Sequence, residues 1–357
     1  MLLQHDVPLG PLTTLKLGGR ARRMALVGEE EEVVEALRDA EAKGEQVLVL
    51  GGGSNVVIAD AGFDGLVLRI ASRGVRMELE DGGVRVEAAA GEDWEPLVQR
   101  CVEAGYSGFE CLSGIPGLVG ATPIQNVGAY GQEVSDTIVS VRVYDRELQR
   151  LVDMAPASCA FGYRQSVFRH NPRFVVMRVA FFLRKSTDSA PVRYAELSRA
   201  LGIGEGETAP VPRVRQAVLS LRHAKGMLLD AGDPDSVSVG SFFVNPTLDA
   251  DALARLERRV AETGALRVGE TLPRFPAAGG TWKVSAGWLV ERAGFPKGFA
   301  AGRVGVSGKH ALALVHHGHG STADLLALAR SIRDGVRVKF GVEISPEPVL
   351  VGCSLDP

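Results

Sequence analysis

One hydroxyl group stands in an apolar segment of this 357-residue chain. Residues 240–246 read GSFFVNP, so Ser241 follows a glycine and precedes two phenylalanines and an Asn-Pro turn. The pattern predicts that Ser241 begins a short, largely buried strand. Its hydroxyl either bonds nearby backbone or, held in a site with little water, delivers a proton by position although it is a weak acid. The surrounding sequence has to decide between these two interpretations.

Two glycine-rich loops indicate a second kind of chemistry. The sequence GGGSN (residues 51–55) follows the apolar segment QVLVL, and a longer loop, GFECLSGIPGLVGATPIQNVGAYGQEVSD, occupies residues 108–136. Backbone amides of such loops bind anions, and Ser54 and Asn55 add side-chain donors. We therefore expect the loops to bind one extended anionic ligand, such as a dinucleotide diphosphate; the alternative is a plain turn of three glycines.

Several familiar signatures are nearly present and fail. A GxGxxG fingerprint needs a third glycine where Val56 stands, and GRVGVSGKH has Arg303 and His310 at positions that a phosphate-binding loop reserves for Gly and Ser or Thr. No GxSxG elbow supports a hydrolase nucleophile. Neighbouring histidines at the end of a strand (316, 317 and 319) point to opposite faces, so no metal site is expected.

The composition is that of an ordinary globular chain. Hydrophobic residues make up 45% and charged residues 23%, with a net charge of -3, so nucleic acid is not an expected partner. The four cysteines form no CxxC pair, which favours reduced thiols. No signal peptide and no run of 18 apolar residues is present, so we expect a cytoplasmic protein without a membrane segment.

The chemical motifs lie between predicted helices and strands. Helices are predicted over residues 29–44, 92–106, 248–264, 284–294 and 321–340 and in VRQAVLSLRHAKG; strands are predicted over residues 46–50, 66–70 and 83–91 and in IVSVRVYDRE, FVVMRVAFFLR, ALALVHH and PVLVG. The polar stretch 186–212 is predicted to be a linker or an active-site loop. The tryptophans 94, 282 and 288 are expected to be packing residues.

Six motifs in a fixed order carry a resemblance to a known family. VLVLGGGSNVVIAD, GIPGLVGATPIQNVGAYGQEVSD, FGYRQSVF, GSFFVNP, KVSAGWLVERAGFPKG and ISPEPVLVG resemble the UDP-N-acetylenolpyruvoylglucosamine reductase (MurB) family over nearly the whole chain. The segment PVRYAEL resembles the subclass with an additional tyrosine loop, in which Tyr194 closes over the substrate.

The resemblance implies a reaction and a role for three residues. NADPH reduces FAD, and the reduced flavin passes hydride to the enolpyruvyl group of a UDP-N-acetylglucosamine derivative, giving UDP-N-acetylmuramate for peptidoglycan synthesis. Arg164 would contact the substrate carboxylate as a planar fork, and Ser241 would donate a proton to carbon. Glu347 would bond the same carboxylate, which requires a protonated or proton-sharing carboxyl because two carboxylates repel.

The remaining site residues follow from the same motifs. The resemblance assigns FAD binding to Gly51, Gly52, Gly53, Ser54, Asn55, Ser113, Gly114, Ile115, Pro116, Gly117, Gly120, Gln125, Asn126 and Gly128. It assigns substrate binding to Tyr130, Tyr163, Tyr194, Asn245 and Lys283, and no metal is implied.

The expected fold is α+β. It combines a two-part FAD-binding region of the vanillyl-alcohol-oxidase type, over residues 1–72 and 73–222, with a C-terminal α/β substrate-binding domain, over residues 223–357, whose last strand returns to the active site. The expected enzyme is an NADP-dependent oxidoreductase, UDP-N-acetylmuramate dehydrogenase, that acts as a monomer on two small-molecule substrates.

The chain departs from the family's pattern before GSFF. Many relatives have a lysine followed by a Pro-Asp-Pro run, whereas this chain reads RHAKGMLLDAGDPDSVSVGSFF, so either Arg222 or Lys225 could supply the cation for nucleotide phosphates. Two other functions remain open: a flavin oxidase of the same fold, which would not need Arg164, Ser241 and Glu347 together, and an inactive nucleotide- or carbohydrate-binding protein.

Overall fold

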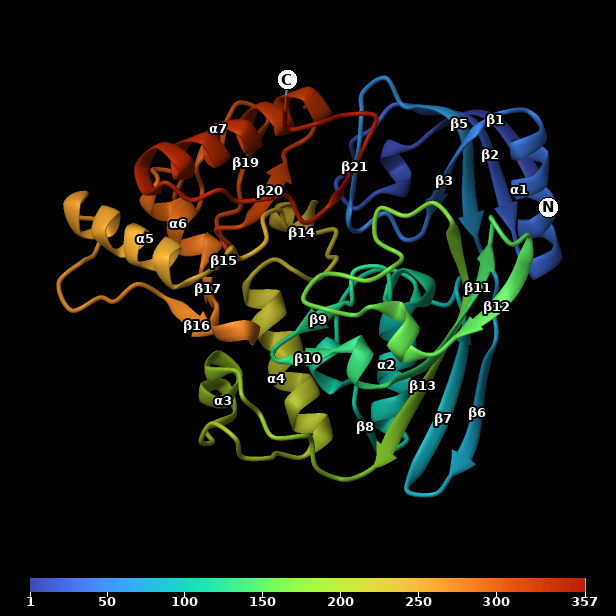
Figure 1. Ribbon diagram of the computed structural model, residues 1–357, viewed down its shortest axis with the longest axis horizontal. Coiled ribbons are helices and arrows are strands. Elements are labelled where there is room, and N and C mark those ends of the chain that lie inside the picture. Colours follow the sequence, from blue (N-terminus) through green and yellow to red (C-terminus); the bar gives the residue numbers. More distant parts are fainter. Residues whose placement is uncertain (357) are drawn as a thin grey trace. The chain divides into compact units, whose positions relative to one another are not determined.

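The chain passes back and forth between two units in the computed structural model, which describes residues 1–356 (Figure 1). The first unit consists of Met1–Val7, Ala21–Gly53 and Phe63–Leu228; the second consists of Pro8–Arg20, Ser54–Gly62 and the chain from Leu229 onward. Both contain helices and sheets, as expected of an α+β fold. Segments 8–20 and 54–62 cluster with the C-terminal part of the chain, whereas the sequence grouped them with the first FAD-binding subdomain. The functional boundaries after residues 72 and 222 stay a prediction.

A four-stranded sheet with one helix forms the beginning of the first unit. Its order is β1 (Leu2–Pro8), β2 (Arg20–Val27), β5 (Phe63–Ile70) and β3 (Gln46–Leu50), with β2, β5 and β3 parallel. The connecting helix α1 (Glu30–Ala42) starts with a capping box between Glu29 and Glu32 and buries Val33 and Leu37. The predicted helix 29–44 and the predicted strands 46–50 and 66–70 are confirmed.

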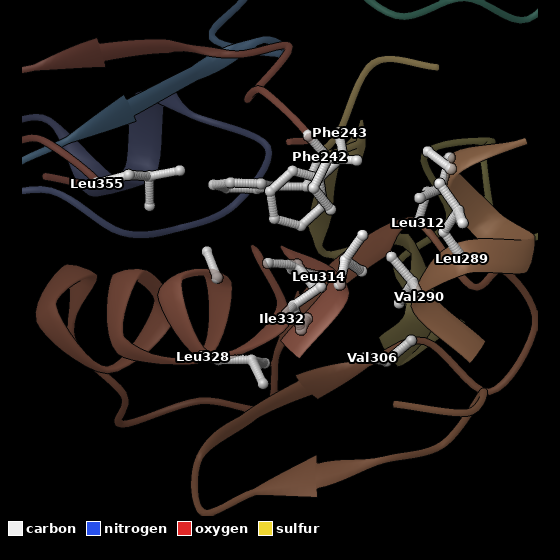
Figure 2. Packing of buried hydrophobic residues seen from close by; sticks show 14 of the residues in the cluster. Phe242, Phe243, Leu289, Val290, Val306, Leu312, Leu314, Leu328, Ile332 and Leu355 are labelled. Carbon is white, nitrogen blue, oxygen red and sulfur yellow. The ribbon is translucent and has the colours of Figure 1, made fainter. Parts of the chain in front are cut away.

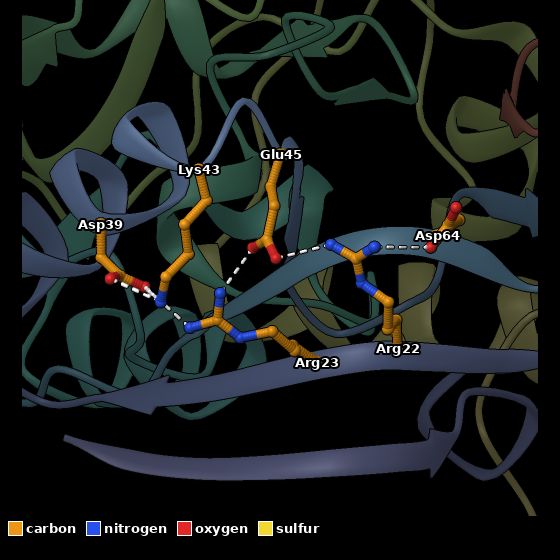
Figure 3. Close-up of polar contacts among 6 residues, drawn as sticks. All are labelled: Arg22, Arg23, Asp39, Lys43, Glu45 and Asp64. Carbon is orange, nitrogen blue, oxygen red and sulfur yellow. Dashed lines mark hydrogen bonds and ion pairs between the residues drawn. The ribbon is translucent and has the colours of Figure 1, made fainter.

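Ion pairs connect α1 to this sheet (Figure 3). Arg23 of β2 is 8% exposed and contacts Asp39 at 2.7 Å and Glu45 at 2.6 Å. Arg22 extends the network to Glu45 and Asp64. Because Arg23 is buried, both of its carboxylate partners are needed to offset the cost of removing its charge from water.

A larger antiparallel sheet forms the core of the first unit. Its order is β12 (Arg150–Met154), β11 (Ile138–Asp145), β13 (Phe174–Lys185), β7 (Gly83–Ala89) and β6 (Val75–Glu80), with β8 (Tyr106–Ser107) paired to β13. Helix α2 (Trp94–Glu103) packs through Trp94, whose ring meets Phe109 at 4.8 Å and Phe181 at 5.9 Å. Trp94 is therefore a packing residue, as expected.

The polar stretch 186–212 contains more structure than the sequence indicated. Helix α3 (Ala195–Leu201) lies within it, and bonds from Val192 N–H to Glu207 O and from Ser189 N–H to Ala209 O close the segment on itself. Its buried Leu197 packs with residues of α4 (Val211–Ala224), which explains why a short helix forms in a polar sequence. The prediction of a linker is wrong over α3, and an active-site loop in this stretch stays a prediction.

The second unit has three small sheets around one apolar core (Figure 2). The sheets comprise β14 (Ser238–Ser241), β20 (Ala313–His316), β19 (Val304–Val306) and β18 (Ala300–Ala301); β15 (Thr247–Leu248), β17 (Trp282–Val284) and β16 (Arg274–Pro276); and β21 (Val349–Val351) with β4 (Val56–Ile58). The helices are α5 (Ala250–Glu262), α6 (Ala286–Arg292) and α7 (Thr322–Phe340). The helices predicted over 248–264, 284–294 and 321–340 are confirmed.

Ser241 ends a strand instead of beginning one. It is the last residue of β14, and Phe242 N–H still donates to Leu312 O at 2.7 Å. The chain then leaves that sheet, because Phe243 forms a bridge with Pro346 and Val244 N–H donates to Ser345 O. The prediction of a strand starting at Ser241 is wrong, although Phe242 and Phe243 are buried as expected.

Short elements complete the chain. The 3-10 helices are η1 (Gly10–Leu12), η2 (Glu110–Leu112), η3 (Val119–Ala121), η4 (Val134–Asp136), η5 (Pro156–Cys159), η6 (Pro234–Ser236) and η7 (Ala278–Gly280), and β9 (Gly128–Ala129) pairs with β10 (Gln132–Glu133). Among the helices of residues 1–356, none is long and apolar enough to cross a membrane.

Candidate active site

The two glycine-rich loops approach each other within the first unit. A Cβ atom added at Gly52 would lie 2.8 Å from Gly117 Cα, so the backbones come together where no side chain fits. Within residues 1–356, the N–H groups of Gly52, Ile115 and Gly117 have no hydrogen-bond partner in the chain. Unpaired amide donors on two adjoining turns form a cradle for an anion, and the diphosphate of FAD fits this donor set.

Backbone and side-chain hydrogen bonds hold the second loop in place. Val119 N–H donates to Glu92 O at 2.8 Å, Gly120 N–H to Ala90 O at 2.9 Å, and Ser113 Oγ to Glu110 O at 2.8 Å. Gly114 N–H donates to the Glu95 carboxylate. These bonds preorganise the loop, so a bound ligand does not have to order it.

Two other residues expected to bind FAD, Gln125 and Asn126, lie just before the hairpin of β9 and β10. The Asn126 side chain is buried and fully engaged, since it donates to Glu133 at 2.7 Å and to Gly162 O at 3.1 Å and accepts from Ser135 N–H at 3.1 Å. Asn126 therefore connects the hairpin to the segment that carries Arg164. Gln125 is half-buried beside it.

Arg164 occupies a tight turn. Gly162 and Gln165 exchange both backbone bonds, at 3.0 and 3.1 Å, so Tyr163 and Arg164 form the two-residue tip. Arg164 has a φ of 53°, an uncommon value for a non-glycine residue. Its Nη2 donates to Gly128 O at 2.8 Å, and its guanidinium lies 5.3 Å from the centre of the Tyr163 ring. The strained turn holds a permanent cation in one orientation.

Two of the expected substrate-binding tyrosines are in contact. The rings of Tyr130 and Tyr194 meet edge to face at 5.4 Å, and Tyr130, like Arg164, has a positive φ of 49°. Lys225 lies 5.7 Å from the Tyr130 ring centre and pairs with Glu196 at 2.5 Å. Burial raises the pKa of Tyr130 to about 12 and also raises that of Tyr194, so both phenols remain hydrogen-bond donors at neutral pH.

In the second unit, a histidine side chain contacts Ser241. His310 Nε2 lies 3.0 Å from Ser241 Oγ, and Ser307, which is fully buried, accepts from the backbone N–H groups of Lys309 and His310. Gly240 has a φ of 74° and lies within the register shift between Ser238 and Ser241. A bulge of this kind turns a side chain away from the regular alternation of the strand.

Backbone pairing brings Glu347 next to the same strand end. Glu347 N–H donates to Phe242 O at 2.8 Å, one residue from Ser241, and Val349 N–H donates to Asn55 O at 3.0 Å. Strand β21 then runs parallel to β4, which follows the GGGSN sequence. Ser241, Glu347 and Asn55 are thus assembled from three distant parts of the chain within one unit.

Asn245 and Lys283 lie on neighbouring segments of that unit. Asn245 Oδ1 accepts from Ala286 N–H at 2.9 Å, at the start of α6. Lys283 lies in β17, opposite Thr247 of β15, and is half-buried. One hydrogen bond therefore orients the Asn245 side chain, and its amide nitrogen is a second group that can donate hydrogen bonds.

His310 is the residue that sequence reasoning missed. In the sequence, His310 is notable only because it stands where a phosphate-binding loop has Ser or Thr. Its partner Ser241 is 69 residues away. No local spacing could have indicated this pair. By contrast His316 is structural, because its two ring nitrogens bond Leu15 O and Gly320 N–H.

Comparison with known proteins agrees with the two-part organisation. Residues 233–351 match the family model of the UDP-N-acetylenolpyruvoylglucosamine reductase C-terminal domain, and residues 21–149 match a FAD binding domain model. The expected combination of a FAD-binding region with a C-terminal reductase domain is confirmed.

Relatives cover almost the whole chain. A UDP-N-acetylenolpyruvoylglucosamine reductase from Thermobifida fusca is 52% identical over 98% of this chain and 98% of its own. One from Streptomyces coelicolor is 51% identical, over 98% and 91%. The crystal structure of the Thermus caldophilus enzyme (MurB) aligns with a TM-score of 0.66 at 24% identity, over 98% and 100% of the two chains, which supports the fold.

Proposed function

Because the chain belongs to the UDP-N-acetylenolpyruvoylglucosamine reductase family, we propose that it reduces the enolpyruvyl group of UDP-N-acetylglucosamine enolpyruvate to UDP-N-acetylmuramate, with NADPH as reductant. Identity above half over nearly the full length of a named reductase is the observation that carries this proposal. We also propose that the reduced flavin passes its electrons to the enolpyruvyl compound and not to oxygen, and we propose the roles of individual residues.

The amide donors of the two glycine-rich loops would hold FAD, which when bound would supply hydride transfer from NADPH to the substrate. Arg164 would bind the substrate carboxylate through its planar fork and stabilise the charge that develops there. The turn at residues 162–165 supports this role, because it fixes the guanidinium before substrate arrives.

Ser241 is the proposed proton donor. As the substrate carbon gains its proton, the Oγ–H bond breaks and a C–H bond forms, so Oγ becomes transiently negative and must regain a proton from water. A donor hydrogen bond from His310 Nε2 would stabilise that oxygen and leave the Ser241 hydrogen directed at the substrate. Glu347, whose backbone N–H donates to Phe242 O next to Ser241, would hydrogen-bond the substrate carboxylate, which requires a proton shared between the two groups.

The remaining assignments complete the proposal. Tyr130, Tyr163, Tyr194, Asn245 and Lys283 would bind the sugar nucleotide. The enzyme would act in the cytoplasm as a monomer; size-exclusion chromatography of the purified protein tests the latter.

The test separates the two half-reactions under anaerobic conditions. We expect Ser241→Ala to take up hydride from NADPH into its flavin at the wild-type rate. Transfer to the enolpyruvyl sugar nucleotide should fall by at least about 100-fold, the usual contribution of general acid catalysis. Ser345→Ala, which removes an exposed hydroxyl nearby in the same unit, serves as the control and should change neither rate.

Product formation by Ser241→Ala at the wild-type rate would exclude Ser241 as the proton donor. A wild-type protein that passes its electrons to oxygen but not to the enolpyruvyl compound would instead indicate a flavin oxidase and refute the reductase assignment.

A further inference from the structure

His310 lies in the loop that connects β19 to β20, residues 307–312. Ser307 Oγ accepts from the backbone N–H groups of Lys309 and His310, so one buried hydroxyl shapes the centre of this loop. The strand pairing of β20 with β14 does not include His310. Other contacts of the loop therefore decide how close the His310 ring lies to Ser241, the last residue of β14.

An ion pair connects the loop to an acidic turn, DAGDPD (residues 230–235), which stands shortly before β14 in the chain. Lys309 Nζ lies 2.8 Å from Asp233 Oδ2, and the Asp233 side chain is 11% exposed. The other oxygen of Asp233 accepts from Asp235 N–H at 3.1 Å, which fixes the carboxylate at the start of η6. A Cβ atom added at Gly308 would lie 3.4 Å from Asp235 Oδ2, so the loop and the acidic turn are in direct contact.

The charges on the two sides of this contact are complementary. The hydrogen bond to Asp233 raises the pKa of Lys309, and the negative charges of Asp235 and Asp230 add to that effect. The acidic turn also has a shape of its own, because Ser236 Oγ donates to Asp230 O at 2.8 Å. It lies where the chain departs from the pattern of many relatives before GSFF. The departure therefore places a preformed partner for Lys309 next to the strand that carries Ser241.

The contact between Ser241 and His310 depends on this arrangement. Ser241 Oγ and His310 Nε2 are 3.0 Å apart, which is within the narrow range of a good hydrogen bond. A displacement of the loop by about 1 Å would break that bond. The ion pair opposes such a displacement, because it joins the segment before β14 to the residue next to His310.

We propose that Asp233 and Lys309 are positioning residues for proton delivery. Their ion pair holds the loop between β19 and β20 so that His310 stays within hydrogen-bonding distance of Ser241. The inference rests on the proposed function, because it concerns the proton donor of that reaction.

The test follows both half-reactions of the holoenzyme under anaerobic conditions in Asp233→Asn and Lys309→Met. NADPH should reduce the flavin of both variants at the wild-type rate. Transfer from the reduced flavin to the enolpyruvyl sugar nucleotide should slow by about 10- to 100-fold, the range that a misplacement of about 1 Å causes. The solvent deuterium isotope effect on this transfer should rise, because proton delivery then limits it more strongly; a purely structural defect would leave the isotope effect unchanged.

Control variants separate positioning from a general loss of ion pairs. Asp356→Asn breaks the pair with Arg333, 2.7 Å long and in the same unit, and should change neither half-reaction. Lys309→Arg keeps the cation and should retain most of the wild-type rate. The double variant Asp233→Asn/Lys309→Met should be no slower than the slower single variant, since both remove one contact. Losses that multiply, or single variants within about 2-fold of wild type, would overturn the proposal.

A measurement without turnover keeps this inference separate from the proposed function. In protein labelled with 15N-histidine, the ring signals of His310, identified by their loss in His310→Gln, should shift in Asp233→Asn and Lys309→Met and not in Asp356→Asn. Unchanged signals would show that the ion pair does not position His310, whatever the substrate is. A wild-type protein that fails to reduce the enolpyruvyl compound while these signals shift would refute the proposed function alone.

Discussion

Gly52 lies so close to Gly117 that Gly52→Ala tests whether the two glycine-rich loops form the FAD site. The new Cβ would lie 2.8 Å from Gly117 Cα, against about 3.4 Å for an ordinary contact, so the backbones must separate by about 0.6 Å. The neighbour is main chain and cannot rotate away. Overpacking of this kind costs about 1–3 kcal/mol, which corresponds to about a 5- to 150-fold increase in the FAD dissociation constant if the flavin-bound form bears the cost.

Gly28→Ala, in the same unit, is the matched control, because its Cβ would lie 3.9 Å from Glu32 Oε2, an ordinary contact. The assay is fluorescence titration of each flavin-depleted variant with FAD, together with the flavin content after gel filtration. We expect Gly28→Ala to bind FAD as the wild type does and Gly52→Ala to lose flavin. Equal affinities for the two variants would show that the loops do not form the FAD site in the arrangement described here.

Two predictions concern stability. Hydrogen bonds from Arg292 hold the pKa of Glu270 at about 2, below its ordinary value of 4.5; its carboxylate therefore stabilises the fold above pH 4.5, and that contribution disappears as the pH falls toward 2. Glu270→Gln should lower the Tm at pH 7, and a difference from wild type that does not shrink on acidification would contradict this. Arg23→Met removes the buried centre of the network in Figure 3 and leaves Asp39 and Glu45 with fewer partners. Urea denaturation should show a loss of about 1–3 kcal/mol in the free energy of unfolding. This is less than for a fully buried pair, because Asp39 is partly solvated and each carboxylate keeps another cation, Lys43 or Arg22. No loss would mean that the network contributes nothing.

Periodicity in the sequence predicted most of the regular elements. Helices α1, α2, α5, α6 and α7 coincide within a few residues with their apolar repeats, because each buries one face in an apolar core. Helix α3 was missed, since its seven residues are stabilised by packing against α4 and not by a repeat of their own.

The motifs also indicated which residues to examine, but not how they are connected. The glycines of both loops were recognised by type, whereas the contact between Gly52 and Gly117 depends on backbone distances that no local pattern contains. Ser241 was recognised within GSFFVNP, yet its place at the end of β14 follows from the competition between β20 and residues 345–347 for the same backbone.

The sequence by itself determined the chemistry that is available: two anion-binding turns, a permanent cation, a hydroxyl and a carboxyl in a fixed order. Only the tertiary structure decided which groups meet. His310 contacts Ser241, and the buried Arg222 donates to a backbone carbonyl, Met227 O, while Lys225, equally plausible in the sequence, pairs with Glu196. The physical reason is that burial and charge pairing depend on segments far apart in the chain, and these come together only when the core forms.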